Sequence, residues 1–128
     1  MAFDFADAAI REARASLGNC QNVCIERRSL PTELPEDSYD LIVVSEILYY
    51  LSAADLASTV DGLVARLEAN GDLIAVHHRA MDRCHGYDGF NVHASLADRP
   101  ELREIACFDD AAFALRVFRK QASAHHVT

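Results

Sequence analysis

The sequence predicts an α/β fold built around a largely parallel sheet. Segments with apolar residues at helical spacing alternate with short apolar runs, an order typical of strands linked by helices. The run Tyr39–Ser45 and the run at 72–77 are unbroken in their aliphatic centres, as strands buried on both faces are. Two shorter runs flank Asp109 and Asp110, which predicts a terminal antiparallel hairpin.

The first third of the chain is predicted to form one helix and one short strand before the first long strand. Apolar residues fall on one face of a helix over Asp7–Leu17, and Gly18 is the expected stop. Residues 22–26, with the sequence NVCIE, are predicted to form a short strand. A loop that contains two prolines then leads to the strand Tyr39–Ser45.

The middle of the chain is predicted to form a capped helix followed by a second buried strand. Ser52 and Asp55 make an S-x-x-D capping pattern at the start of this helix. Asn70 and Gly71 are expected to end it, and the strand over 72–77 follows directly. The apolar residues that repeat at helical spacing between these signals are Leu56, Val60, Leu63, Val64 and Leu67.

The last third is predicted to hold a surface loop, a short helix and the hairpin. Residues 79–89 are rich in polar and turn-forming side chains, which indicates a loop. A short helix is expected over 92–97, and the two hairpin strands are expected over 102–108 and 112–118.

The composition predicts one globular domain. The chain has 128 residues, of which 51% are hydrophobic and 25% are charged. These values fit a single packed domain and exclude disordered, collagen-like and coiled-coil chains. We expect the domain to span residues 1–120, with a polar tail over 121–128.

The charge balance argues against two classes of partner. The chain has 12 Lys and Arg against 20 Asp and Glu, a formal charge of −8, and it contains no basic run, so we expect neither nucleic acid nor a membrane surface as partner. There is no secretory signal, and the longest aliphatic stretch, 41–44, is too short to span a bilayer. The four cysteines are irregularly spaced and are expected to be reduced. These features predict a cytoplasmic protein that acts on a neutral or cationic molecule.

The order of the segments resembles a known enzyme family. YDLIVVSEILYYL at 39–51, the capped helix, NGDLIAVHHR at 70–79 and the hairpin together resemble the class I S-adenosylmethionine-dependent methyltransferases. Within that family, SEILYYL and AVHHR resemble the nodulation-protein-S (NodS)-like members. The resemblance implies a Rossmann-like sheet, S-adenosylmethionine as the cofactor, and transfer of a methyl group to an amine or hydroxyl of a small-molecule acceptor.

The resemblance also implies a cofactor site at the ends of the first strands. Asp4 matches the acidic residue that accepts hydrogen bonds from the two ribose hydroxyls, a role in which a carboxylate makes charge-assisted bonds. Phe5 would lie against the adenine or the ribose. Ser29 and Leu30 stand at the adenine contact, where the family often has an acidic residue at the position of Ser29.

Candidates for chemistry follow the two long strands. Ser45 and Glu46 stand at the carboxyl end of a parallel strand, where ligands bind in open sheets, and by resemblance they face the methionine part and the methyl group. An amine acceptor must lose a proton, and the candidates are Glu46 or His77 as the base, Tyr49 as an orienting hydroxyl, and the adjacent His78. The same residues also fit a structural interpretation, with Glu46 solvated, Tyr49 in packing and His77 in the core.

The family's first strand and Gly-rich turn have no counterpart in this sequence. It contains no G-x-G, and Met1 matches a position near the end of the family's second strand. We therefore expect an N-terminally truncated sheet in which Tyr39–Ser45 keeps one unpaired edge. The product could begin further upstream, another chain could supply the strand, or 22–26 could pair there. If the chain exists alone, we expect a homodimer at this edge.

Two further interpretations complete the predictions. His77, His78, Cys84, His85 and His93 lie in one region, but their spacing is not that of a zinc site, so no metal is expected. The alternative to an enzyme is a truncated, non-catalytic binding or dimerisation module derived from a methyltransferase.

Overall fold

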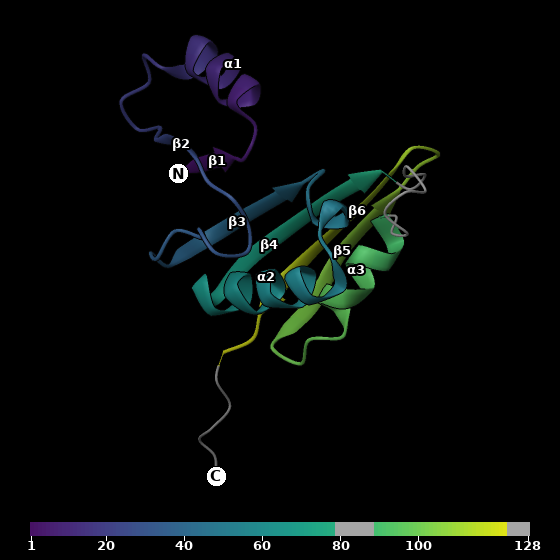
Figure 1. The fold of residues 1–128 in the computed structure, drawn as a ribbon. Coiled ribbons are helices and arrows are strands. Elements are labelled where there is room, and N and C mark those ends of the chain that lie inside the picture. Colours follow the sequence, from purple (N-terminus) through teal and green to yellow (C-terminus); the bar gives the residue numbers. More distant parts are fainter. Residues whose placement is uncertain (79–88, 123–128) are drawn as a thin grey trace. The chain divides into compact units, whose positions relative to one another are not determined.

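The computed structural model describes residues 1–78 and 89–122 of the chain. The chain divides into two compact units, Met1–Pro35 and Glu36–Thr128. The first unit contains β1, α1 and β2, and the second contains the remaining strands and helices (Figure 1).

The first unit is a small strand–helix–strand motif. β1 (Ala2–Asp4) and β2 (Ile25–Arg27) pair in parallel, and α1 (Asp7–Leu17) connects them. The predicted bounds of this helix are confirmed. The strand expected over 22–26 begins later, at Ile25, because the amides of Cys20 and Val23 donate to the carbonyls of Leu17 and Cys20 in turns and are not available to a strand.

The second unit is built on a four-stranded sheet in the order β3-β4-β6-β5. β3 (Tyr39–Ser45) and β4 (Leu67–His78) are parallel, and β6 (Phe113–Lys120) runs antiparallel to both β4 and β5 (Leu102–Asp109). The predicted α/β class, a mostly parallel Rossmann-like arrangement with a carboxyl-terminal antiparallel hairpin, is confirmed. The second strand of the hairpin, β6, lies between β4 and β5 and runs antiparallel to both. The carboxyl ends of β3, β4 and β5 therefore lie at the same end of the sheet.

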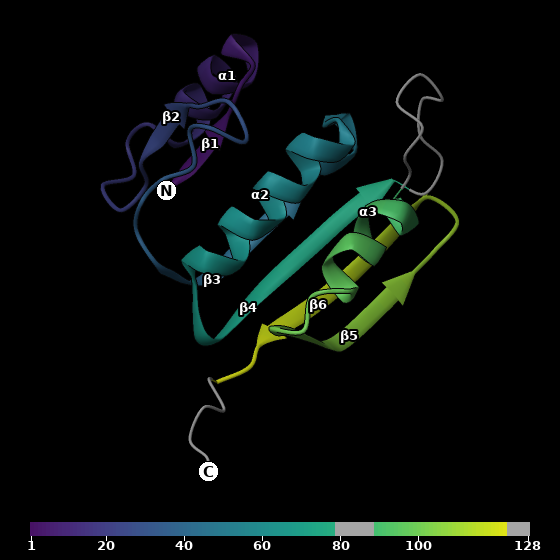
Figure 2. The same ribbon diagram turned by 60° about the horizontal axis from the view of Figure 1, so that its bottom comes forward.

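Two helices cover one face of this sheet. α2 (Ala53–Arg66) and α3 (Gly89–Ala97) lie on the same side of the strands (Figure 2). Alternate residues of β4 point to that side and are buried, as the two-residue repeat of a strand requires. The core between sheet and helices includes Leu48, Leu56, Val60, Leu63, Leu67, Leu73, Ala75, Val92, Leu96, Ala114 and Phe118.

The opposite face carries exposed apolar side chains. Leu41 and Val43 of β3 are 52% and 59% exposed, and Phe108 of β5 is 62% exposed. Within the described residues, β3 pairs only with β4, so its other edge has no neighbouring strand.

The boundary between α2 and β4 differs from the prediction. α2 ends at Arg66, and Leu67 already has extended dihedrals, φ −82° and ψ 129°. Leu67 is buried at 2% exposure, so it continues the apolar repeat although it belongs to the strand. Asn70, which was expected to end the helix, lies inside β4 and has a left-handed backbone conformation with φ 66°. A hydrophobic repeat alone cannot distinguish the last turn of a helix from the first buried residue after it.

The remaining predictions concern the carboxyl-terminal third. α3 begins at Gly89, three residues before the predicted start. Both strands of the hairpin are present: β5 extends one residue beyond the predicted end, and β6 begins one residue later and ends two residues later than predicted. The predicted loop at 79–89, except for Gly89, and the tail from residue 123 onward lie outside the described residues. In the described part of the chain, every helix is too short or too polar to cross a membrane.

Candidate active site

The carboxyl ends of β3 and β4 form the polar edge of the second unit. The two strands are parallel, with Ser45 opposite Val76, so both end at the same side of the sheet. Glu46 follows β3 with φ 58°, a left-handed conformation that is rare for a residue with a long side chain. Its amide still donates to the carbonyl of Val76 at 3.0 Å. The chain therefore turns sharply at Glu46 while that residue remains attached to β4.

The turn places the Glu46 carboxylate against His78. The backbone amide of His78 donates to Oε1 of Glu46 at 2.8 Å, and Oε2 lies 3.6 Å from Nε2 of the His78 ring. The two side chains are 36% and 45% exposed. A carboxylate and an imidazole at this distance, both open to solvent, can exchange a proton with a bound molecule.

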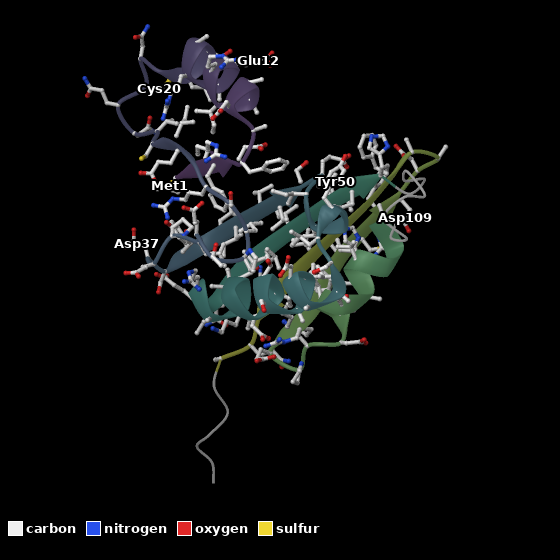
Figure 3. All side chains as sticks on the ribbon, viewed as in Figure 1. Met1, Glu12, Cys20, Asp37, Tyr50 and Asp109 are labelled. Atoms are coloured by element: carbon white, nitrogen blue, oxygen red, sulfur yellow. The ribbon has the colours of Figure 1, made fainter. Side chains whose placement is uncertain are left out.

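An aromatic ring packs against His78, and a tyrosine lies at the same end of the sheet. The rings of His78 and Phe113 lie 4.3 Å apart between centroids, since the two residues are opposite each other in β4 and β6. Tyr50 is 50% exposed in the 3-10 helix η1 (Leu48–Tyr50) and lies at the same end of the sheet as Asp109 (Figure 3). Tyr49 lies in η1 as well, but its side chain is outside the described part.

His77 lies on the other face of β4, under the helices. It is 0% exposed, and its Nε2 accepts the amide of Leu48 at 3.3 Å. Its Nδ1 lies 3.0 Å from Nε2 of His93, which belongs to α3 and is 3% exposed. The two rings meet edge to face at a centroid distance of 5.1 Å.

Both buried histidines are held in the neutral form. Burial, with a smaller effect of His93, lowers the pKa of His77 from 6.5 to about 3. Burial and the positive charge of Arg116 lower the pKa of His93 from 6.5 to about 4, while Asp109 opposes that change. Neither ring carries a charge near neutral pH.

In the first unit, the predicted ribose contact stands at the end of β1. Oδ1 of Asp4 accepts the amide of Ala6 at 3.0 Å, which holds the carboxylate at the strand end. Phe5 follows and is 53% exposed. A carboxylate next to an exposed ring offers a hydrogen-bond acceptor for hydroxyl groups and an apolar face for a planar base.

The predicted adenine contact lies at the same edge of the first unit. β1 and β2 are parallel, and Ser29 and Leu30 follow β2. The amide of Ser29 donates to Oε1 of Glu33 at 2.7 Å. The structure thus brings Asp4, Phe5, Ser29 and Leu30 to one edge of the first unit, as it brings Ser45, Glu46 and His78 to one edge of the second.

Sequence reasoning missed the pairing of His77 with His93 and the contact of His78 with Glu46. Adjacent residues of a strand point to opposite faces, so only one of His77 and His78 can lie on the helix-covered side. That signal is present in the sequence, but the position of the helices is not. Among the described residues, no group of three or more His, Cys, Asp or Glu could hold a metal ion; Cys84 and His85 lie outside those residues.

The fold has several relatives among solved structures. A protein from Pseudomonas syringae assigned to the methyltransferases matches with a TM-score of 0.77 and 30% identity, covering 92% of this chain and 70% of that one. The N-methyltransferase NodS from Bradyrhizobium japonicum WM9, solved in complex with S-adenosyl-L-homocysteine, matches with a TM-score of 0.78 and 23% identity, covering 92% and 64%. This chain thus spans less than two thirds of the NodS chain in that complex. No family model and no curated protein sequence matches the present chain.

Proposed function

Because the chain belongs to the S-adenosylmethionine-dependent methyltransferases, we propose that it transfers a methyl group to an amine or hydroxyl of a small molecule. The family and the cofactor are as the sequence resemblance predicted. The observation that carries the proposal is the Glu46–His78 pair at the carboxyl edge of β3 and β4, in a chain with 30% identity to the Pseudomonas syringae protein. In open α/β sheets this edge is where ligands bind.

The first unit supplies residues that fit the nucleoside part of the cofactor. We assign the ribose hydroxyls to Asp4, whose carboxylate is held at the strand end by the amide of Ala6. We assign the adenine side to Phe5, Ser29 and Leu30, at the same edge of the unit. A charged acceptor for two hydroxyls and an exposed apolar ring support this assignment.

The second unit supplies the residues for the methionine part and for the reaction. We assign Ser45 and Glu46 to the end of the cofactor that carries the reactive methyl group, which S-adenosylmethionine supplies on a sulfonium. The acceptor forms its new bond to the methyl carbon as the carbon–sulfur bond breaks, and an amine or hydroxyl also loses a proton. That proton passes to the Glu46 carboxylate or to Nε2 of His78, which lie within 3.6 Å of each other.

Two other residues have orienting roles in the proposal. We assign the role of orienting hydroxyl to Tyr49, which belongs to η1 after Glu46. His77 was the second candidate base. Its complete burial and its bond to the Leu48 amide support a positioning role for it and leave proton transfer to Glu46 and His78.

The chain also offers a surface for a second copy of itself. The outer edge of β3 has no partner strand among the described residues, and on the adjoining face of the sheet Leu41 and Val43 are each more than half exposed. Edges of this kind, without lysine or proline, pair readily with other strands. We propose a homodimer about this edge; a two-fold axis would join β3 to its copy antiparallel. The net charge of −8 supports a cytoplasmic protein without nucleic acid as a partner.

A non-catalytic module is the second candidate function. The observation that favours it is the same exposed edge, which serves pairing and needs no chemistry. Cofactor binding separates the two candidates, because a module that only dimerises has no use for the Asp4 and Glu46 positions.

The test is isothermal titration of the chain with S-adenosylhomocysteine, the stable product. Asp4→Ala should weaken binding by roughly ten- to a hundred-fold, since it removes charge-assisted bonds to the ribose. Glu12→Ala is the matched control, because Glu12 lies on the exposed surface of α1 in the same unit and carries the same charge. No binding by the folded chain would contradict the proposal and favour the non-catalytic module.

A further inference from the structure

The buried pair His77 and His93 takes no part in the proposed proton transfer. The two residues are 0% and 3% exposed. Burying a neutral imidazole in a core costs free energy unless its nitrogens form hydrogen bonds, a cost that an apolar side chain would not have. A polar pair in such a place is retained only where its hydrogen bonds are satisfied or used.

The proton on each ring follows from a single backbone amide. The amide of Leu48 can only donate, so Nε2 of His77, 3.3 Å away, must be the acceptor and carries no proton. The neutral ring then has its proton on Nδ1. That nitrogen lies 3.0 Å from Nε2 of His93, which must accept. His93 in turn carries its proton on Nδ1, a buried nitrogen that has no hydrogen-bond partner among the described residues, and the two rings share one tautomer.

This chain of bonds ends next to the proposed base. Leu48 lies two residues after Glu46, and its side chain is completely buried. β4 thus holds the turn at two points: the backbone amide and the ring of His78 contact the Glu46 carboxylate, and the His77 ring, on the other face of the strand, accepts the Leu48 amide. The turn includes the positive φ of 58° at Glu46, a conformation that the surroundings must maintain.

We propose that His77 and His93 are positioning residues for the proposed active site: the two rings, each protonated on Nδ1, hold the Leu48 amide and thereby the turn that presents Glu46. The proposal rests on the proposed function for its purpose, but its geometry can be tested independently. Arg116 and Asp109 are the charged groups that act on His93 from the hairpin, in opposite directions, and burial keeps the ring neutral.

The first measurement is the tautomer of each ring. Long-range ¹H–¹⁵N nuclear magnetic resonance spectra of the ¹⁵N-histidine-labelled chain at pH 7 should show Nδ1 protonated and Nε2 unprotonated in both His77 and His93. A proton on Nε2 of His77 would overturn the proposal, because the Leu48 amide would then have no acceptor. This measurement needs no variant, so it decides the matter even where a substitution prevents folding.

The second measurement follows the amide of Leu48 in two variants. His93→Leu removes the acceptor for Nδ1 of His77, whereas His93→Gln keeps a side-chain oxygen that can accept. Hydrogen exchange of the Leu48 amide should accelerate by about five-fold in His93→Leu, the change expected for one net hydrogen bond, and should stay near the original rate in His93→Gln. The amide of Leu56, which donates to Ser52 in α2, is the internal control.

The outcomes separate this proposal from the proposed function. Equal Leu48 exchange in folded His93→Leu and His93→Gln would show that His93 acts only by packing and would overturn the positioning role. S-adenosylhomocysteine should bind His93→Leu more weakly than His93→Gln; equal affinity would likewise contradict it. If the unchanged chain has the expected tautomers but binds no S-adenosylhomocysteine, the proposed function is contradicted, whereas the hydrogen bonds from His93 through His77 to the Leu48 amide are confirmed.

Discussion

The pKa values of His77 and His93 predict a specific loss of stability on mild acidification. In the folded chain these values are lowered to about 3 and about 4, whereas an unfolded chain has values near 6.5. Between these limits the unfolded state binds more protons than the folded state. Stability is therefore fully present above pH 6.5 and decreases as the pH falls through that value.

The size of the effect follows from the same values. At pH 5.5 each unfolded histidine is about nine-tenths protonated while its folded counterpart is neutral, which costs about 1.4 kcal/mol per residue and about 3 kcal/mol for the pair. The carboxylates with lowered pKa values, Asp72 and Glu101, have ordinary values of 3.8 and 4.5 and act mainly below this range. The window from pH 7.5 to 5.5 thus isolates the histidines.

Urea unfolding followed by far-ultraviolet circular dichroism measures the loss. The free energy of unfolding of the unchanged chain should fall by about 3 kcal/mol between pH 7.5 and pH 5.5. The double variant His77→Gln/His93→Gln should lack that part of the decrease, although it starts from a lower value. An equal pH dependence in the two proteins would show that the histidines are not held neutral in the core, and would refute the reasoning.

Three further results are expected from other parts of the second unit. Lys120→Met should lower the free energy of unfolding by about 2 kcal/mol in urea titrations, because the ammonium group donates to two carbonyls at the end of α2 at 2.8 Å; an unchanged value would show that water replaces it. Ser52→Ala should cost about 1 kcal/mol in the same assay, since its hydroxyl accepts the amide of Asp55 at the start of α2. Val43→Lys should convert the proposed dimer into a monomer by light scattering, whereas Ile105→Lys, on the opposite edge strand, should not; a monomeric unchanged chain would contradict the dimer.

The long elements could be predicted because their signals are local. The apolar run Tyr39–Ser45 and the repeat that follows the Ser52 cap both gave the right element. The predicted end of α2 was wrong because Leu67 is buried whether it belongs to a helix or to a strand. The start of β2 was wrong because turn hydrogen bonds at Cys20 and Val23 are not encoded by hydrophobicity.

The site was predictable in location but only partly in composition. Ser45 and Glu46 could be placed from the end of an aliphatic run, because ligands bind at the carboxyl ends of parallel strands. The choice between His77 and His78 could not be made from the sequence. It depends on which face of β4 the helices cover, and this is set by the handedness of the connection through α2 and by the packing of α3, which are tertiary properties.

The position of α3 also explains how a histidine in a helix acts on the turn at the end of β3. His93 carries no motif with any neighbour, and in the sequence it could be grouped only with potential metal ligands. Once α3 packs on β4, the ring of His93 contacts the ring of His77, which in turn accepts the amide of Leu48. The Glu46 turn is strained, with φ 58°, and a strained residue persists only where several contacts agree on its position. The two adjacent histidines of β4 hold this turn with rings on opposite faces of the strand: His78 contacts the Glu46 carboxylate, and His77 accepts the Leu48 amide. This role accounts for the buried pair of His77 and His93 in a core where apolar side chains would pack without needing hydrogen bonds.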